Sequence, residues 1–348
     1  YVLDDYSALR EVSAEQMAQE ATLFKPRAAE WYIPRSHLDF DTPKGSFGAQ
    51  HYTAPNPAFG ANFTYYLKES LTSKKDVRQA KEKPLIESNQ NVPFPGWEAV
   101  EDEATEQGPK VWLVISKGNE VIRRVAAGTG EGFHRVAWDL KYPSPGIIDL
   151  NGNNTGFGGF MVAPGTYTAT LYKQVDGEVS KLGESVDFEV ERLREGALSG
   201  SSPEVTASFW RSYEDMNKIT VVFSSELDKA TKKIMAMQKA LSQSKVKPGK
   251  LDNDLSKARK NLLEMASQFY GNPAKTQMGA KTRPTIGGRM FTLQIGVGNS
   301  TYGPTETHKA TLKIVETELS QLMKRLNDQM DQMDDLRNEL IAAGAPWV

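Results

Sequence analysis

The sequence predicts a protein of mixed α and β structure with more than one domain: an antiparallel β-sandwich followed by an antiparallel bundle of helices. Between residues 46 and 192, apolar side chains recur at every second position, which is the period of a strand with one buried face. From residue 203 onward they recur at steps of three and four, as in helices that bury one stripe. The chain of 348 residues is also longer than one hydrophobic core usually serves.

Residues 1–45 are expected to hold a strand and a connector. Residues 1–6 have the composition of a strand end and no Met precedes them, so we expect the last strand of a preceding domain. Such a strand would pair with that domain or with another chain, because an unpaired edge leaves backbone groups unsatisfied. Ser13 and Gln16 have capping-box spacing and predict a short helix around 14–21. Prolines and aromatic residues downstream favour an irregular connector that wraps on a surface.

The β domain predicted at 46–192 contains strand-like segments in which apolar and polar residues alternate. They are 61–67, 110–115, 121–125, 133–140, 165–172 and 184–190. Polar stretches rich in turn-forming residues interrupt the pattern at 70–108 and 146–160, and we expect both to be exposed insertions. The first is compatible with a short helix near 74–82. Residues 128–132 precede a strand, not a helix, so we interpret them as a hairpin loop and not as a phosphate-binding loop.

The helical domain is predicted at 203–345. Its three helices are expected at about 204–245, 250–270 and 304–343. Ser202 and Pro203 suit the N-cap and the first position of the first helix. The last helix has the most regular apolar stripe, which only Gln329 interrupts. Because each stripe needs a partner, we expect the helices to pack on one another, with a Gly- and Pro-rich stretch at 271–303 between the second and the third. The alternative is a dimer formed through the last helix.

The composition argues against several functions. A net charge of −2 provides no field for holding a polyanion, so nucleic acid is not an expected partner. There is no run of eighteen or more apolar residues, so we expect no membrane span. The absence of cysteine removes disulfides, thiolate metal sites and thiol nucleophiles together.

No residue is assigned a catalytic or cofactor-binding role. The four histidines are isolated, without the spacing of a zinc site. Asp149, Asn151 and Asn153 stand at alternate positions, as the first ligands of a calcium loop do. An EF-hand needs Gly where Asn154 stands and Glu where Phe160 stands, so a polar turn explains the same residues. We therefore predict no cofactor, with calcium at these three residues as the alternative.

Aromatic residues in the two insertions are the candidate contacts to a ligand or partner. Trp97 lies in the first insertion, and Phe157 and Phe160 lie in the second. Such side chains either stack on a sugar ring or dock a protein, or they fix the loop to its own domain, and both alternatives stay open. The acidic cluster at 101–106 has the carboxylates that glycoside hydrolysis uses, but no apolar surroundings to raise a pKa. We interpret it as a solvated acidic loop.

Several stretches resemble one family. YVLDDYSALR at 1–10 resembles the final propeller strand of large secreted Bacteroidetes proteins with BNR or sortilin-like repeats, which are often labelled glycosyl hydrolases. LFKPR at 23–27 and YTAPNPAFGA at 52–61 resemble the segments that follow that propeller. GFHRVAWDL at 132–140 and APGTYTATL at 163–171 are similar to the immunoglobulin-like domain of flagellar-hook capping proteins, which the same secreted proteins carry.

The resemblance implies the C-terminal region of such a protein. The implied fold is an immunoglobulin/fibronectin-like antiparallel β-sandwich followed by the three-helix bundle, with an N-terminal strand left over from the β-propeller. The implied location is secreted, periplasmic or on the surface of a Gram-negative bacterium. No catalytic residue of a sialidase motif maps onto this chain. The leading hypothesis is therefore a non-catalytic module that supports the propeller and binds protein or glycan. The alternatives are an accessory part of a glycoside hydrolase whose active site lies upstream, and a helical oligomerisation element.

Overall fold

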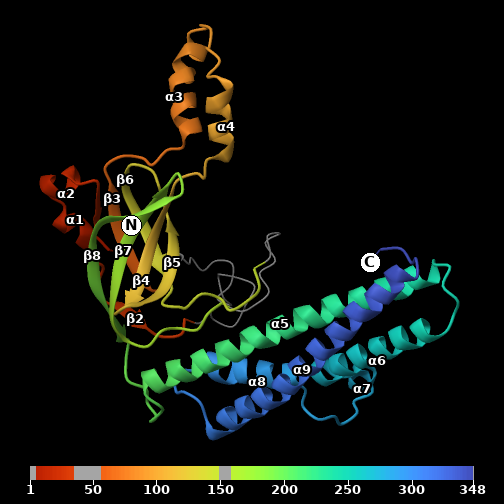
Figure 1. Ribbon diagram of the computed structural model, residues 1–348. Helices are drawn as coiled ribbons and strands as arrows, with labels where there is room; N and C mark the ends of the chain where they lie inside the picture. The colour runs from red at the N-terminus through yellow and green to blue at the C-terminus, as the bar shows by residue number, and fades with distance from the viewer. Residues whose placement is uncertain (1–4, 35–55, 149–157, 348) are drawn as a thin grey trace, which may run out of the picture. The chain divides into compact units, whose positions relative to one another are not determined.

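The computed structural model describes residues 5–34, 56–148 and 158–347 (Figure 1). The protein is mixed α/β, with β-sheets and a helical C-terminal region. Its chain divides into two compact units. We call residues 1–143 with 161–197 the β unit, and residues 144–160 with 198–348 the helical unit.

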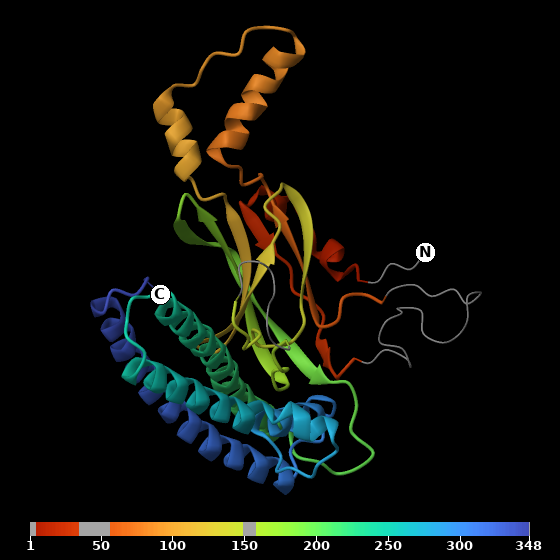
Figure 2. The ribbon, with the colours of Figure 1, turned by 90° about the vertical axis from the view of Figure 1, so that its right-hand side faces the viewer.

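The β unit contains two sheets in the part of the chain that is described (Figures 1 and 2). The smaller has the order β1–β3–β6, and the larger has the order β2–β8–β7–β4–β5. The strands are β1 Ala21–Leu23, β2 Ala29–Trp31, β3 Ala61–Leu67, β4 Lys110–Lys117, β5 Glu120–Ala127, β6 Gly132–Trp138, β7 Gly165–Val175 and β8 Glu178–Arg192. Neighbouring strands are antiparallel, except that β2 and β8 are parallel. Each of the six predicted segments overlaps a strand.

Aromatic side chains from the two sheets meet in the core of the β unit. The rings of Phe63 and Phe188 lie 5.0 Å apart, edge to face, and the ring of Trp138 lies 5.5 Å from that of Tyr167. All four side chains are buried. In β3 and β4 every second side chain points to this core, because successive side chains of a strand face opposite sides.

The N-terminal connector is more regular than predicted. Residues 1–4 of the expected strand lie outside the described residues, and Asp5 and Tyr6 lie in no strand. Helix α1, Ser7–Glu11, follows directly. Helix α2, Ala14–Ala18, has the predicted capping box, but it ends early because β1 begins three residues later. The connector also supplies β2, in which Trp31 is buried and its Nε1 donates to the carbonyl of Val162 at 2.7 Å.

The interpretation of residues 128–132 as a hairpin loop was wrong. They join β5 to β6, and these strands lie in different sheets, because β6 pairs along its whole length with β3. The Tyr65 hydroxyl donates to the carbonyl of Gly128 at 2.8 Å, and His134 Nε2 lies 2.6 Å from the carbonyl oxygen of Gly130. These contacts join the loop to β3 and β6 of the smaller sheet. The glycine-rich sequence of this loop is therefore explained by its role as a connection between the two sheets.

The helical unit consists mainly of long helices that bury one face each. The helices are α5 Pro203–Ser242, α6 Lys250–Tyr270, α7 Pro273–Gln277, α8 Ile286–Gly298 and α9 Glu306–Ala342. Helix α5 starts as predicted, with Ser202 as the N-cap and Pro203 as the first residue. Helices α5, α6 and α9 pack on one another, with buried residues such as Phe223, Leu262 and Leu326. None of the described helices is long and apolar enough to cross a membrane.

The stretch at 271–303 is not simply a Gly- and Pro-rich connection, because it contains α8. This helix buries four apolar side chains, those of Ile286, Met290, Leu293 and Val297. It is joined to α5 by hydrogen bonds from Trp210 Nε1 to the carbonyl of Val297 at 2.9 Å and from the Tyr213 hydroxyl to that of Met290 at 3.4 Å. Glycines lower its intrinsic helix propensity, so tertiary packing determines its structure.

Candidate functional site

The first insertion forms a two-helix arm in the β unit. It consists of α3, Lys74–Glu87, and α4, Trp97–Thr105, and it stands away from the strands of this unit in both views (Figures 1 and 2). The sequence predicted a shorter helix near 74–82. It also predicted a solvated acidic loop at 101–106, and this prediction was wrong, because most of these acidic residues lie in α4. Neither helix of the arm has a buried residue, so an apolar core does not hold the arm together.

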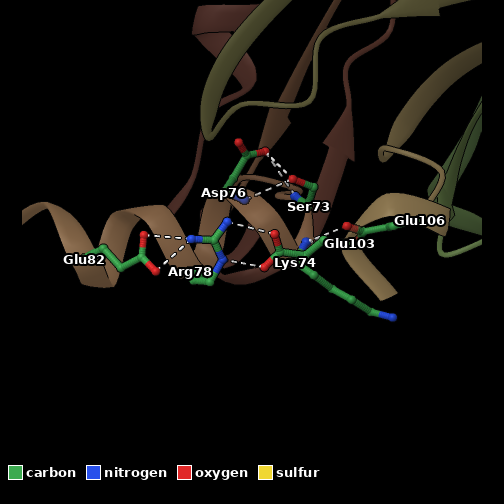
Figure 3. A network of polar contacts seen from close by, with 7 residues as sticks. All are labelled: Ser73, Lys74, Asp76, Arg78, Glu82, Glu103 and Glu106. Atoms are coloured by element: carbon green, nitrogen blue, oxygen red, sulfur yellow. Dashed lines mark hydrogen bonds and ion pairs between the residues drawn. The ribbon is translucent and has the colours of Figure 1, made fainter. Parts of the chain in front are cut away.

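An ion network joins the two helices (Figure 3). Arg78 donates from Nε and Nη2 to the two carboxylate oxygens of Glu103, at 2.6 and 2.8 Å, and from Nη1 to Glu82 at 2.7 Å. This bidentate arrangement fixes both distance and orientation between α3 and α4. The hydrogen bond from Arg78 holds the pKa of Glu103 below its ordinary value, and Glu103 raises the pKa of Arg78. Glu103, a member of the acidic cluster noted in the sequence, is thus a structural ion-pair partner of Arg78.

The base of the arm is also fixed by polar contacts. The backbone N–H of Lys74 donates to both carboxylate oxygens of Glu106, at 3.0 and 2.8 Å, and this contact joins the first residue of α3 to the end of α4 (Figure 3). Ser73 and Asp76 form a capping box that begins α3. The Lys74 ammonium lies 3.2 Å from Asp176 in the turn between β7 and β8, and this hydrogen bond raises the pKa of Lys74. The arm therefore leaves the sheets in a defined direction.

The end of the arm presents an exposed aromatic pair, Phe94 and Trp97. Their rings lie 5.1 Å apart at an interplanar angle of 69°, and the residues are 61% and 73% exposed. Gly96 between them has φ of 98°, a conformation that favours glycine, and it is the N-cap of α4. Ile86 and Val92, which flank the same connection, are exposed as well. The arm thus carries an apolar tip that remains exposed among the described residues of its own unit.

The other sequence candidates have different outcomes. Asp149, Asn151, Asn153 and Phe157 lie outside the described residues. Among the residues that are described, no three His, Asp or Glu side chains are grouped so as to hold a metal ion.

Phe160 packs within the helical unit, on α5. Its ring stacks on that of Trp210 at 5.4 Å and meets the edge of Tyr213 at 5.5 Å. Its backbone N–H donates to Glu214 Oε1 at 2.5 Å. The aromatic ring of Phe160 therefore fixes its loop to a helix, which is one of the two alternatives for such a residue.

Glu214 is a buried acid that no pattern in the sequence singled out. It is 1% exposed, and its second carboxylate oxygen accepts a hydrogen bond from Arg211 at 2.5 Å. Burial raises the pKa of Glu214, while the bonds from Phe160 and Arg211 oppose that shift. Both partners of this carboxylate are explained by the packing of the helical unit, so we assign it no chemistry.

No protein-family model, no curated protein and no solved structure matches this chain.

Proposed function

We propose that this chain is a non-catalytic interaction module, in which the two-helix arm presents Phe94 and Trp97 to a partner. The observation that carries the proposal is an exposed aromatic pair on an arm held by ion pairs. Covering apolar surface stabilises a complex by about 25 cal/mol per Å². Aromatic side chains are also enriched among the residues that contribute most to binding.

A protein partner fits this tip better than a glycan does. The two rings are inclined at 69°, so they do not form one flat platform for a sugar ring, and Ile86 and Val92 widen the apolar surface beyond the rings. A groove on a protein can receive both rings and the neighbouring aliphatic side chains together. The network around Arg78 supports this use, because a tip that is ordered before binding loses less conformational entropy in the complex.

We further propose that the β unit is an immunoglobulin/fibronectin-like sandwich and that the helical unit is built on a three-helix bundle. An immunoglobulin/fibronectin-like sandwich is supported by Tyr167, whose hydroxyl donates to the carbonyl of Ala163 four residues upstream at 2.6 Å, as in a tyrosine corner. A three-helix bundle, with α8 added to it, is supported by the mutual packing of α5, α6 and α9. From the sequence resemblance we also propose a secreted or cell-surface protein with a propeller before this region. In that arrangement the chain supports the propeller while the arm binds.

Cross-linking through the tip tests the proposal. A photo-reactive benzoyl-phenylalanine at Ile86 should give a discrete cross-linked protein in an extract of the cells that make this protein. Adding Phe94→Ala and Trp97→Ala should reduce the apparent affinity by about thirtyfold or more, since loss of the two rings together is expected to cost at least about 2 kcal/mol. The matched control is Val121→Ala with Val179→Ala, two apolar residues of the same unit that are each 57% exposed.

The same variants on a glycan array separate the two partner classes. Glycan binding that the tip substitutions abolish would place the partner among sugars and support the glycoside-hydrolase alternative. Cross-links and glycan binding that survive the tip substitutions unchanged would show that the arm is not the contact. The oligomerisation alternative has less support, because the stripe of α9 is already buried by the other helices of its own unit.

A further inference from the structure

A second surface differs from the arm in its charge. No Asp or Glu occurs between residues 265 and 305, although the chain holds 44 acidic residues in total. The same stretch contains four cations, Lys275, Lys281, Arg283 and Arg289. In a chain of net charge −2, this segment is a local concentration of positive charge.

Three of these cations lie on one closed loop, residues 272–284, which we call the basic loop. It leaves the end of α6 at Gly271 and returns at Thr285, the N-cap of α8. A Cβ on Gly271 would lie 3.3 Å from Thr285 Cγ2, so the two ends of the loop meet. Every residue of the loop is exposed. Compact surface loops with adjoining ends are frequently functional.

The backbone of the basic loop is ordered by its own hydrogen bonds. Asn272 caps α7 by accepting from the N–H groups of Ala274 and Lys275, at 3.0 and 3.2 Å. At the other end, the N–H of Ala280 donates to the carbonyl of Lys275 at 3.0 Å, and Gly279 has φ of 64°. The backbone of the loop is therefore ordered without a hydrophobic core.

The cations of the loop have no acidic partner within the described part of the chain. Lys275, Lys281 and Arg283 form no ion pair there, whereas Arg289, just beyond the loop, lies 3.9 Å from Glu318. In the middle of the loop stands Met278, which is 84% exposed. A flexible apolar side chain between cations that lack an acidic partner suits a contact surface that adapts to an anionic ligand.

We propose that the basic loop is a docking site for an acidic segment of a partner protein. Carboxylates complement its three cations, and Met278 covers an apolar side chain between them. A membrane surface is a poorer occupant, because the loop has one large apolar side chain to insert and three cations where stable anchoring needs more. A nucleic acid is poorer too, because the loop has no aromatic ring on which a base could stack. This surface is independent of the arm.

The test measures binding of the full chain to a labelled synthetic peptide in which Glu alternates with Ser and Leu, by fluorescence polarisation. Binding should weaken as ionic strength rises, because the pairs are exposed and screened. The variant Lys275→Gln/Lys281→Gln/Arg283→Gln should bind about tenfold more weakly. The matched control Lys232→Gln/Lys245→Gln/Lys247→Gln removes three exposed lysines of the same unit and should bind as the original chain does.

Other outcomes overturn the proposal. Equal loss in both triple variants would mean that net charge alone drives binding. Binding to phosphatidylserine vesicles or to an oligonucleotide, without binding to the peptide, would replace the protein partner by a membrane or a nucleic acid. The variant Phe94→Ala/Trp97→Ala should keep its affinity for the peptide, so failure at the arm and failure at the basic loop are distinguishable. Circular dichroism of each variant should match that of the original chain, since every altered residue is exposed.

Discussion

Some polar residues are buried because of their tertiary contacts, at positions where the local sequence pattern favours an apolar residue. Glu214 stands on the buried face of α5, where an apolar residue would be expected. The carboxylate is tolerated because it accepts the N–H of Phe160, which lies 54 positions earlier in the chain, and a charged hydrogen bond from Arg211. No local pattern connects Phe160 with Glu214, whereas Arg211 lies one helical turn before Glu214 in α5.

Glu214 predicts a pH dependence of stability. Burial raises its pKa in the folded state above the unfolded value of about 4.3, so the folded protein binds this proton more tightly. The resulting stabilisation is complete below the unfolded pKa and is lost as the pH rises through the folded pKa. Glu214→Gln cannot titrate, so the free energy of unfolding of the variant should rise relative to that of the original chain over the pH interval that begins at this unfolded value.

Urea unfolding of both proteins over a series of pH values measures this difference. The comparison is informative because the amide of Gln keeps an acceptor for the Phe160 N–H. Two stability curves that stay parallel across that interval would contradict a raised pKa for Glu214.

Individual helices contain polar positions that fix their alignment. Gln329, the one residue that interrupts the stripe of α9, is 4% exposed, and its Oε1 accepts a hydrogen bond from Asn261 Nδ2 of α6 at 2.8 Å. An apolar residue would bury more favourably there, but it would also allow neighbouring registers of α6 against α9. The polar pair therefore ties one specific turn of α9 to one specific turn of α6.

A double-mutant cycle measures this pair. Gln329→Leu or Asn261→Leu alone should each lower the free energy of unfolding by about 1 kcal/mol, because each leaves the other amide without its partner. The double variant should recover that loss, since both polar groups are then removed together. Additive losses in the double variant would show that the two amides are not coupled.

At the scale of the whole molecule, the described residues form two hydrophobic cores, one in each unit. In the β unit Trp138 of β6 is fully buried, and its ring contacts Tyr167 and Phe188 of the larger sheet. In the helical unit Phe223 of α5 is fully buried, and its ring lies 5.0 Å from that of Phe269 of α6. Each core is made by residues of its own unit. Removing a ring from one core should therefore affect mainly the unit that contains it.

Trp138→Ala and Phe223→Ala should each cost about 3–5 kcal/mol of stability, the usual cost of truncating a buried aromatic side chain. Amide hydrogen exchange should show the largest loss of protection in the β unit for the first variant and in the helical unit for the second. Trp97→Ala is the control, since a residue that is 73% exposed should change stability by less than about 0.5 kcal/mol. Equal loss of protection in both units from either core variant would contradict separate cores.

Elements whose signals are local could be predicted from the amino-acid sequence. Alternation in 61–67 and 110–115 is enough to predict strands, because a strand side chain must face either core or solvent. The stripes of α5, α6 and α9 are likewise read from a helical period, and the caps at Ser13 and Ser202 lie within three residues of their partners. Trp97 could be selected as a candidate because a large aromatic residue in a polar stretch needs an explanation.

Features that depend on contacts between distant residues could not be predicted in this way. The acidic residues that were expected in a loop lie in α4, which the ion pair between Arg78 and Glu103 joins to α3. The glycine-rich stretch forms α8, which hydrogen bonds from Trp210 and Tyr213 join to α5. The connection after β5 leads to another sheet because β6 finds its partner in β3. Local propensity differs between alternatives by less than about 1 kcal/mol per residue, whereas burial of one large side chain contributes about 1.5–3 kcal/mol. Contacts between residues far apart in the sequence therefore prevail wherever they conflict with a local signal.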